Sequence, residues 1–263
     1  MIKNAKISVV INTYNATEHL KQVIESVGGF DEVLVCDMES TDGTVDLAYS
    51  MGCRVVTFPR GGHAIVEPAR EYAIHEAVSE WVLVVDADEL VTPQLRQYLY
   101  GRVGRSDCPD GLYIPRHNRF MGRYTQAFAA DHQLRFFRRD KTHWPCVIHA
   151  APVVDGRVEK IAKNSRGIEL VHLADESMSE LVEKCNRYTD YDLLKKQHKH
   201  YGAVALLFRP LWKFVSFYLM QGHWRDGSRG VLFSASKAMY QFVLVAKVME
   251  RRLRSTDENT SAI

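Results

Sequence analysis

The sequence lacks the charge excess that a nucleic-acid partner requires. Its 34 Lys and Arg residues nearly balance 32 Asp and Glu residues, which leaves a formal net charge of +2 at pH 7. Proteins that bind nucleic acids normally concentrate a basic excess on one face or along one helix. We therefore expect no nucleic-acid partner for this chain.

Paired cysteines are also missing. The five cysteines are odd in number, widely spaced and without a Cys-x-x-Cys motif; they stand at positions 36, 53, 108, 146 and 185. This pattern favours reduced thiols in a cytoplasmic protein over a disulfide framework or a structural zinc site.

Long uninterrupted apolar runs are absent as well. No stretch reaches 18 apolar residues without a charge, so we expect no membrane-spanning helix. The first apolar run, residues 7–11, is too short for the hydrophobic region of a signal peptide. The sequence therefore predicts a protein that stays in the cytoplasm.

What is present is typical of a globular α/β protein. The 263 residues are 46% hydrophobic and 25% charged, which excludes disordered and fibrous classes. In the first hundred residues, β-rich runs alternate with segments of helical periodicity; the runs are 7–12, 32–37, 54–58 and 81–86. This alternation predicts a mostly parallel sheet flanked by helices, with ligands bound beyond the carboxyl ends of its strands.

The remainder of the chain has a different organisation. From 108 to 172, short extended pieces separated by turns predict a mixed or antiparallel extension of the sheet. Ser177 and Glu180 have the spacing of a capping box, which predicts a helix start. The chain from about 201 is helical and rich in large apolar residues, and we expect residues 255–263 to form a disordered tail.

Polar residues follow three of the predicted strands. The fourth run ends in Asp86-Ala87-Asp88, which would place two carboxylates in the ligand crevice. Two neighbouring carboxylates repel one another unless a positive group separates them, and a divalent cation such as Mg²⁺ or Mn²⁺ meets that need. The alternative is that both residues merely cap the next helix.

The order of these motifs resembles family 2 glycosyltransferases, which are inverting, metal-dependent sugar transferases of the GT-A fold. The motifs are Thr13-Tyr14-Asn15, Asp37-x-x-Ser40-x-Asp42-Gly43-Thr44 and Asp86-x-Asp88. The resemblance extends to bacterial lipopolysaccharide-core β-glucosyltransferases through four further segments, which are 135–139, 147–149, 171–173 and 208–214, and through the closing 226–230.

The resemblance implies roles for individual residues. Asp37 would hydrogen-bond the nucleotide base, Asp86 would contact the ribose or donor sugar, and Asp88 would bind the divalent cation. The donor-binding set would comprise Thr13, Tyr14, Asn15, Asp37, Ser40, Asp42, Arg70, Asp86, Ala87, Asp88, Arg135 and Arg138. Arg135 and Arg138 could equally bind an acidic acceptor, or lie on a basic strand that faces solvent.

The resemblance also implies a carboxylate base beyond the Asp-x-Asp motif. Asp131 is our candidate catalytic residue, and the alternative is an ordinary turn acid. The subgroup often has glutamate where this chain has Ala150, so a base at that position would be missing here.

His143, Cys146 and His149 have a spacing that could suggest zinc, but no second cysteine pair supports it. His172 could complete the shell of the catalytic metal, or hold a strand.

The C-terminal segment predicts an association with membrane. Within residues 203–220, the stretch 206–219 alone contributes ten large apolar side chains, interrupted by Arg209, Pro210 and Lys213, which suits an amphipathic helix lying at an anionic lipid surface. The alternative is a set of helices packed on the sheet or on another subunit, as in a homo-oligomer.

We therefore expect three parts. Residues 1–175 would form the GT-A catalytic domain that binds a nucleotide sugar, 176–254 a helical region that contacts membrane and acceptor, and 255–263 a tail. The protein would transfer a sugar, with UDP-glucose as the expected donor, to a lipopolysaccharide-core or other lipid-linked glycan at the cytoplasmic face of the inner membrane. The alternatives are a polyprenyl-phosphate sugar synthase and a non-catalytic protein that binds nucleotide sugars.

Overall fold

The centre of the sheet is β1 (Ile7–Thr13), a strand whose seven residues are all buried. In the computed structural model, β2 (Glu32–Asp37) and β4 (Trp81–Asp86) pair with β1 in parallel on its two sides, and β3 (Arg54–Thr57) pairs with β2. The description covers residues 5–61, 66–125, 131–147, 150–162, 165, 167–175, 177–196 and 199–261, with side chains as far as 255. The predicted parallel sheet is confirmed.

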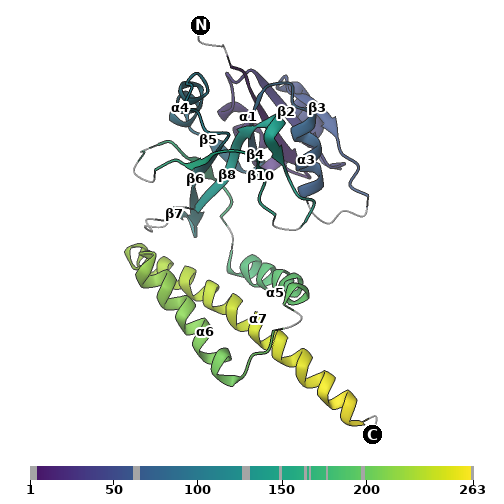
Figure 1. The fold of residues 1–263 in the computed structure, drawn as a ribbon, viewed down its shortest axis with the longest axis vertical. Helices are drawn as coiled ribbons and strands as arrows, with labels where there is room; N and C mark the ends of the chain where they lie inside the picture. Colours follow the sequence, from purple (N-terminus) through teal and green to yellow (C-terminus); the bar gives the residue numbers. More distant parts are fainter. Residues whose placement is uncertain are drawn as a thin grey trace. The chain divides into compact units, whose positions relative to one another are not determined.

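Helices cover both faces of this sheet (Figure 1). Because side chains alternate along a strand, Val9 and Ile11 face one core and Val10 faces the other. The first core is completed by α1 (Thr17–Ser26), α2 (Thr44–Ser50) and α4 (Pro93–Val103), and the second by α3 (Glu67–Glu76). Thr92 accepts a hydrogen bond from Leu95 N at 3.2 Å, which confirms the predicted start of α4.

Beyond β4 the sheet becomes mixed, as the sequence predicts. The strand order is β3-β2-β1-β4-β8-β6-β12-β5, with β8 antiparallel to both β4 and β6. The added strands are β5 (Glu89–Val91), β6 (Gly111–Phe120), β8 (Asp131–Arg138), β11 (Val158–Lys160) and β12 (Leu170–His172). The short 3-10 helix η1 (Arg139–Lys141) and the strands β9 (Thr142–His143) and β10 (Val153–Val154) follow β8. His172 pairs with Glu89, which brings residues far apart in sequence next to the Asp-x-Asp motif.

The chain divides into two compact units. Residues 1–118 and 130–174 form the first unit, and residues 119–129 and 175–263 form the second. The sequence analysis placed one boundary after 175 and did not separate 119–129 from the first part. The second unit contains β7 (Arg123–Tyr124), α5 (Met178–Lys195), α6 (Ala203–Val215), the π-helix η2 (Ser216–Met220), the 3-10 helix η3 (His223–Asp226) and α7 (Ser228–Ser261).

Within the second unit, α5 and α6 both pack along α7 (Figure 1). Tyr240 Oη donates to Asp192 at 3.1 Å, and Lys247 Nζ donates to Asp190 at 2.6 Å, so α7 is tied to α5 by polar contacts. The capping box of Ser177 and Glu180 is present, as predicted. The tail expected from 255 is not seen as such, because helix α7 continues to Ser261.

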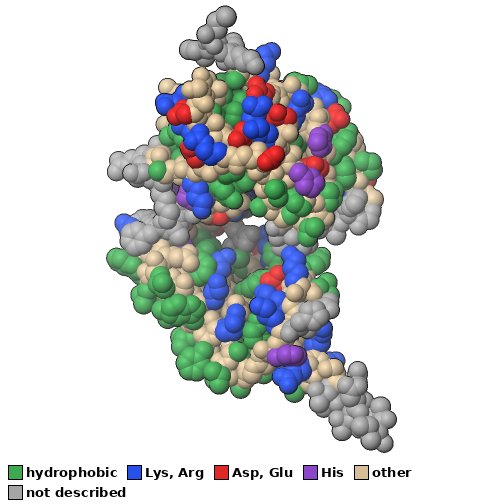
Figure 2. Space-filling model, viewed as in Figure 1, with side chains coloured by type: hydrophobic (Ala, Val, Ile, Leu, Met, Phe, Trp, Pro, Cys, Tyr) green, Lys and Arg blue, Asp and Glu red, His purple; other side chains and the backbone are tan. Residues whose placement is uncertain are grey.

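An unpartnered apolar stripe runs along α6. Its residues recur at the spacing of one helix face and are each more than half exposed; they are Val204, Leu207, Phe208, Leu211 and Trp212. Figure 2 shows this hydrophobic surface over α6. The ranges Ala203–Met220 and Ser228–Ser255 are long and apolar enough to cross a membrane, with 0% and 28% of each window buried. Both ranges pass this test by length and composition alone, so the expectation of no spanning helix stays a prediction.

A glycine allows the start of α7 to approach η3. A Cβ atom added at Gly230 would overlap the carbonyl oxygen of His223, which belongs to the backbone and has little freedom to move. We expect Gly230→Ala to destabilise the second unit by about 1–3 kcal/mol, the usual cost of overpacking. The measurement is urea unfolding followed by circular dichroism.

The matched control is Gly101→Ala in α4, where an added Cβ meets nothing within 4 Å. This change should leave stability unchanged or raise it by up to about 1 kcal/mol, because alanine favours a helix over glycine. Equal effects of the two substitutions would contradict the close approach of η3 and α7.

Candidate active site

The ends of β1 and β2 are joined by a buried carboxylate. Asp37 is 1% exposed and accepts hydrogen bonds from Thr13 Oγ1 at 2.8 Å and from Ser40 N at 2.8 Å. Ser40 Oγ, which also donates to Asp37, accepts from Asn15 N at 2.9 Å. Four predicted site residues therefore lie together, and Asp37 shapes the two loops that end these strands.

The other residues of these loops are held by similar contacts. Asn15 has a left-handed backbone, with φ at 48°, and its side-chain oxygen accepts from Thr41 N at 2.8 Å. Asp42 accepts from Thr44, whose hydrogen bonds lower the pKa of the Asp42 carboxyl. Tyr14 is 41% exposed, and the guanidinium of Arg60 lies 3.8 Å from the centre of its ring. Tyr14 thus offers an aromatic face at this edge of the sheet.

Asp86 is held between two arginines. Arg70 from α3 donates to one carboxylate oxygen at 2.5 Å, and Arg135 from β8 donates to the other. Burial by itself would raise the pKa of Asp86, but the charges of Arg135 and Arg70 outweigh burial and hold that pKa below its usual range. Asp86 is therefore an anion whose charge is already neutralised by the protein.

The ion pairs continue away from Asp86. Arg135 also lies 3.6 Å from Glu89, and Glu89, which is 0% exposed, lies 3.0 Å from Arg116. Arg116 in turn donates to Asp131 at 3.0 Å and 2.6 Å. The result is one alternating network of three arginines and three carboxylates, in the order Arg70, Asp86, Arg135, Glu89, Arg116 and Asp131.

Asp131 is firmly engaged in this network. In addition to Arg116, Asn118 donates to it at 3.2 Å and Gln133 at 2.7 Å. Burial raises the pKa of Asp131, but the charge of Arg116 and these hydrogen bonds lower that pKa overall. A carboxylate with a lowered pKa is a weak base. In this arrangement Asp131 fits poorly the role that the sequence analysis gives it.

Asp88 forms no ion pair with the three arginines of the network, although its charge still acts on Arg135. Its side chain is 36% exposed, and its Oδ2 lies 3.2 Å from His172 Nε2. Its backbone oxygen accepts from Leu173 N at 2.8 Å, which fixes the turn beside β12. Asp88 and His172 together present one carboxylate and one imidazole to solvent. Within the described residues, no group of three or more His, Cys, Asp or Glu side chains is arranged as a metal site.

A cleft in the first unit is lined by two arginines of the network, Arg70 and Arg135. It is lined by residues of α3, β8 and the segment after β9, which are Glu67, Arg70, Gln133, Leu134, Arg135, Trp144, Ala150, Ala151 and Pro152. The Arg70 guanidinium lies 4.9 Å from the ring centre of Trp144. Three buried nitrogens here, Arg70 Nε and Arg135 Nε and Nη1, have no hydrogen-bond partner among the described residues. Such donors favour an anionic ligand.

One predicted site residue lies elsewhere. Arg138 pairs with Trp81 at the start of β4, about 17 Å along the strand from Asp86. It contacts Asp140 at 2.9 Å and Glu80 at 3.1 Å. Arg135 and Arg138 are three positions apart on one strand, so their side chains point to opposite faces. The structure therefore does not bring Arg138 together with the other predicted donor-site residues, and strand alternation is the sequence signal that separates it from Arg135.

Two members of the network, Glu89 and Arg116, are not among the site residues predicted from the sequence. Glu89 directly follows the Asp-x-Asp motif, but no sequence motif around its partner Arg116 indicates that Arg116 belongs to the site. The zinc alternative receives no support from His143, because His143 Nδ1 lies 2.9 Å from Glu71 Oε1. His149 falls outside the described residues.

Comparisons with known proteins place these motifs in a family. The family model "Glycosyl transferase family 2" matches residues 8–153. The lipopolysaccharide core biosynthesis glycosyltransferase LpsC of Rhizobium meliloti is 28% identical, over 95% of this chain and 94% of its own. An uncharacterized glycosyltransferase of Rickettsia typhi is 27% identical, over 95% of this chain and 89% of its own.

Among solved structures, Staphylococcus aureus TarS (residues 1–349) covers 95% of this chain and 92% of its own, with a TM-score of 0.50 and 14% identity. At that identity the likeness shows the fold alone. Glucosyl-3-phosphoglycerate synthase from Mycobacterium tuberculosis, solved with Mn²⁺, uridine diphosphate and glucosyl-3-phosphoglycerate, covers 43% of this chain and 45% of its own, with a TM-score of 0.37 and 24% identity. So partial a match carries no argument about this protein.

The buried network predicts unequal costs for two arginines of the same strand. Arg135→Gln leaves Asp86 and Glu89 without their shared cation, so we expect a loss of about 3–5 kcal/mol in the free energy of unfolding. Arg138→Gln removes partly exposed pairs and should cost at most about 1 kcal/mol. Urea unfolding of both variants at pH 7 measures the difference, and similar losses would contradict the network.

Proposed function

Because the chain belongs to glycosyl transferase family 2, we propose that it transfers a sugar from a nucleotide diphosphate donor to a lipid-linked glycan. UDP-glucose is the proposed donor, the lipopolysaccharide core is the proposed acceptor, and the reaction is proposed to invert the anomeric carbon. The observation that carries the proposal is the arrangement at the carboxyl ends of β1, β2 and β4. There an exposed Asp88 lies at the end of the same sheet as the loops joined by Asp37.

The donor nucleotide would bind over the loops that follow β1 and β2. Ligands of open α/β sheets bind outside the carboxyl ends of the strands. Tyr14 offers an exposed aromatic face there, and Asn15 and Ser40 hold the loops in one shape. Both oxygens of Asp37 are already engaged, so its proposed contact with the base would have to compete with Thr13 and Ser40.

A divalent cation suits the donor set of Asp88 and His172. Asp86 is neutralised by Arg70 and Arg135, which leaves Asp88 as the carboxylate of the motif with charge to share. Magnesium is commonly held by one or two carboxylates together with substrate phosphates, and manganese also accepts imidazole. When bound, the cation would neutralise the diphosphate as it leaves. The proposed protein ligands are Asp88 and His172.

The arginines of the cleft would bind anionic oxygens. Arg70 and Arg135 carry buried nitrogens without partners among the described residues, and a guanidinium binds phosphate oxygens in a fixed, planar geometry. The same two residues keep Asp86 charged and in place. We therefore assign them a double role, in positioning Asp86 and in holding the donor diphosphate.

A catalytic base at Asp131 would require a rearrangement of the ion-pair network. Asp131 would have to leave Arg116 before it could accept a proton from an acceptor hydroxyl. Its engagement favours a second candidate function, a polyprenyl-phosphate sugar synthase, because a phosphate acceptor needs no strong base. Asp131→Asn separates the two: loss of turnover supports glycan transfer, and retained turnover supports the phosphate acceptor.

We also propose that the second unit lies on the inner membrane. The apolar stripe of α6 has no partner within the described residues, and Arg209 and Lys213 lie on the same helix. An interfacial helix inserts its apolar face among acyl chains while its cations meet anionic headgroups. This arrangement would bring a lipid-linked acceptor to the protein.

The first test of the proposal is metal dependence through Asp88. We expect Asp88→Asn to lower the release of UDP from UDP-glucose at least about 100-fold, because it removes a carboxylate from the cation site. EDTA should abolish the activity of the unaltered protein, and Mg²⁺ or Mn²⁺ should restore it. The matched control is Asp46→Asn, an exposed acid on α2. Full activity after EDTA dialysis would refute the role of the metal.

The second test is vesicle flotation. The unaltered protein should float with anionic vesicles and much less with neutral ones. Replacing Phe208 and Trp212 together by Gln should abolish flotation, whereas Tyr49→Gln, an equally exposed aromatic residue of the first unit, should not. Retention of the protein through an alkaline wash would contradict interfacial binding and would indicate a spanning helix.

A further inference from the structure

The second unit contains a pocket that the proposed catalytic chemistry does not use. It lies between the turn joining β6 to β7 and the start of α7, and it is lined by Phe120, Arg123, Tyr124, Thr125, His223, Arg225, Asp226, Arg229 and Phe233. We propose that this pocket binds a phosphate or carboxylate group of the glycolipid acceptor. The inference rests on the proposed function, because it names the chemistry of the acceptor in that reaction.

Glycines shape the backbone beside the pocket. Gly222 and Gly227 flank η3 with φ at 82° and 59°, values that side-chain-bearing residues rarely adopt. Gly230 permits the close approach of α7 to His223. The segment 226–230, which the sequence analysis noted without a role, therefore turns η3 into α7 and places Arg229 at the pocket.

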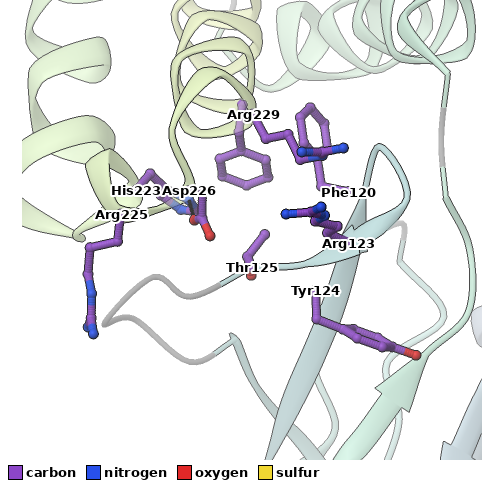
Figure 3. Close-up of a pocket in the computed structure, with 9 residues that line it drawn as sticks. Phe120, Arg123, Tyr124, Thr125, His223, Arg225, Asp226 and Arg229 are labelled. Atoms are coloured by element: carbon purple, nitrogen blue, oxygen red, sulfur yellow. Dashed lines mark hydrogen bonds and ion pairs between the residues drawn. The ribbon is translucent and has the colours of Figure 1, made fainter.

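Two arginines extend into the pocket. Arg229 Nε donates to Met121 O at 2.8 Å, which fixes its guanidinium against the turn between β6 and β7. The backbone of Arg123 pairs with Phe120, but its guanidinium forms no ion pair or hydrogen bond with another described residue. Figure 3 shows Arg123 and Arg229 reaching into the same gap, whereas Arg225 and Tyr124 point away from it. Two guanidinium groups in one gap repel one another unless an anion separates them.

The acidic groups nearby do not balance this charge. Asp226 is the one acid among the described residues that line the pocket, against the two arginines that reach into the gap, and it lies 3.3 Å from His223 Nδ1. Burial lowers the pKa of His223 and outweighs the opposing effect of Asp226. The described lining residues therefore carry an excess of positive charge.

The position of the pocket favours an anion that belongs to a lipid-linked molecule. Phe217 of η2 packs against His223 and Phe233, with ring centres 6.2 Å and 6.0 Å apart. Phe233 also packs against Phe120 at 5.3 Å. The pocket is thus continuous with the helix α6–η2 that we place on the membrane. The aromatic rings exclude water, which strengthens the attraction between guanidinium and anion.

The test is vesicle binding of Arg123→Gln, with Arg187→Gln as the control. The guanidinium of Arg123 has no partner within the described residues, so its replacement should leave the fold intact. Arg187 is an exposed arginine of α5 outside the pocket, and its replacement removes the same charge. The probes are neutral phosphatidylcholine vesicles that carry either a phosphorylated inner-core glycolipid or the same charge density of phosphatidylglycerol.

We expect Arg123→Gln to weaken binding to the glycolipid vesicles about tenfold, the scale of one lost hydrogen bond to a charged group. Arg187→Gln should change it less than about twofold, and binding to phosphatidylglycerol should respond equally weakly to both substitutions. Equal effects of the two substitutions on glycolipid binding would overturn the proposal.

Two further outcomes would also overturn it. Equal sensitivity of phosphatidylglycerol binding to Arg123→Gln would indicate a site for ordinary lipid headgroups. Complete competition by millimolar inorganic phosphate would indicate a site for free phosphate. The release of UDP by the unaltered protein is measured separately: its absence with every donor and acceptor refutes the proposed function, whereas the vesicle comparison decides the pocket.

Discussion

The alternating network of Arg70, Asp86, Arg135, Glu89, Arg116 and Asp131 is the constraint on which the candidate site depends. Charges removed from water are costly unless each has a partner, and here each arginine lies between carboxylates or opposite one. The network joins α3, β4, β5, β6 and β8, so it fixes the positions of the elements that carry the Asp-x-Asp motif. Its balance also decides which carboxylate is available, because Asp86 is neutralised and Asp88 is not.

The balance of positive and negative side chains differs between the sites of the two units. In the first, three arginines meet three carboxylates, and the remaining donors are a few nitrogens of Arg70 and Arg135 at the cleft. In the second, two arginines reach into the pocket beside η3, and the one aspartate among its described lining residues contacts a histidine. A balanced set holds protein elements in place, whereas an unbalanced set favours an anionic ligand. The proposed donor and acceptor sites follow from this difference.

Membership of glycosyl transferase family 2 and the observed geometry agree on the general chemistry but not on every residue. The ends of β1, β2 and β4 lie at one edge of the sheet, as the resemblance implies. Asp131 does not have the environment of a good base, because Arg116 lowers its pKa. A fold common to many transferases thus leaves the identity of the base to the particular residues of each chain.

The parallel sheet, the helix starts at Thr92 and Ser177 and the order of the three motifs can all be predicted from the sequence. These features are local, because periodicity and capping depend on residues within a few positions of one another. The packing of β8 against β4 is what brings Arg135 to Asp86 and leaves Arg138 at the other end of β4. Tertiary packing also joins Arg229 to Met121 across 108 positions of the chain. Ion pairs depend on the register between distant strands and helices, and no local pattern records that register.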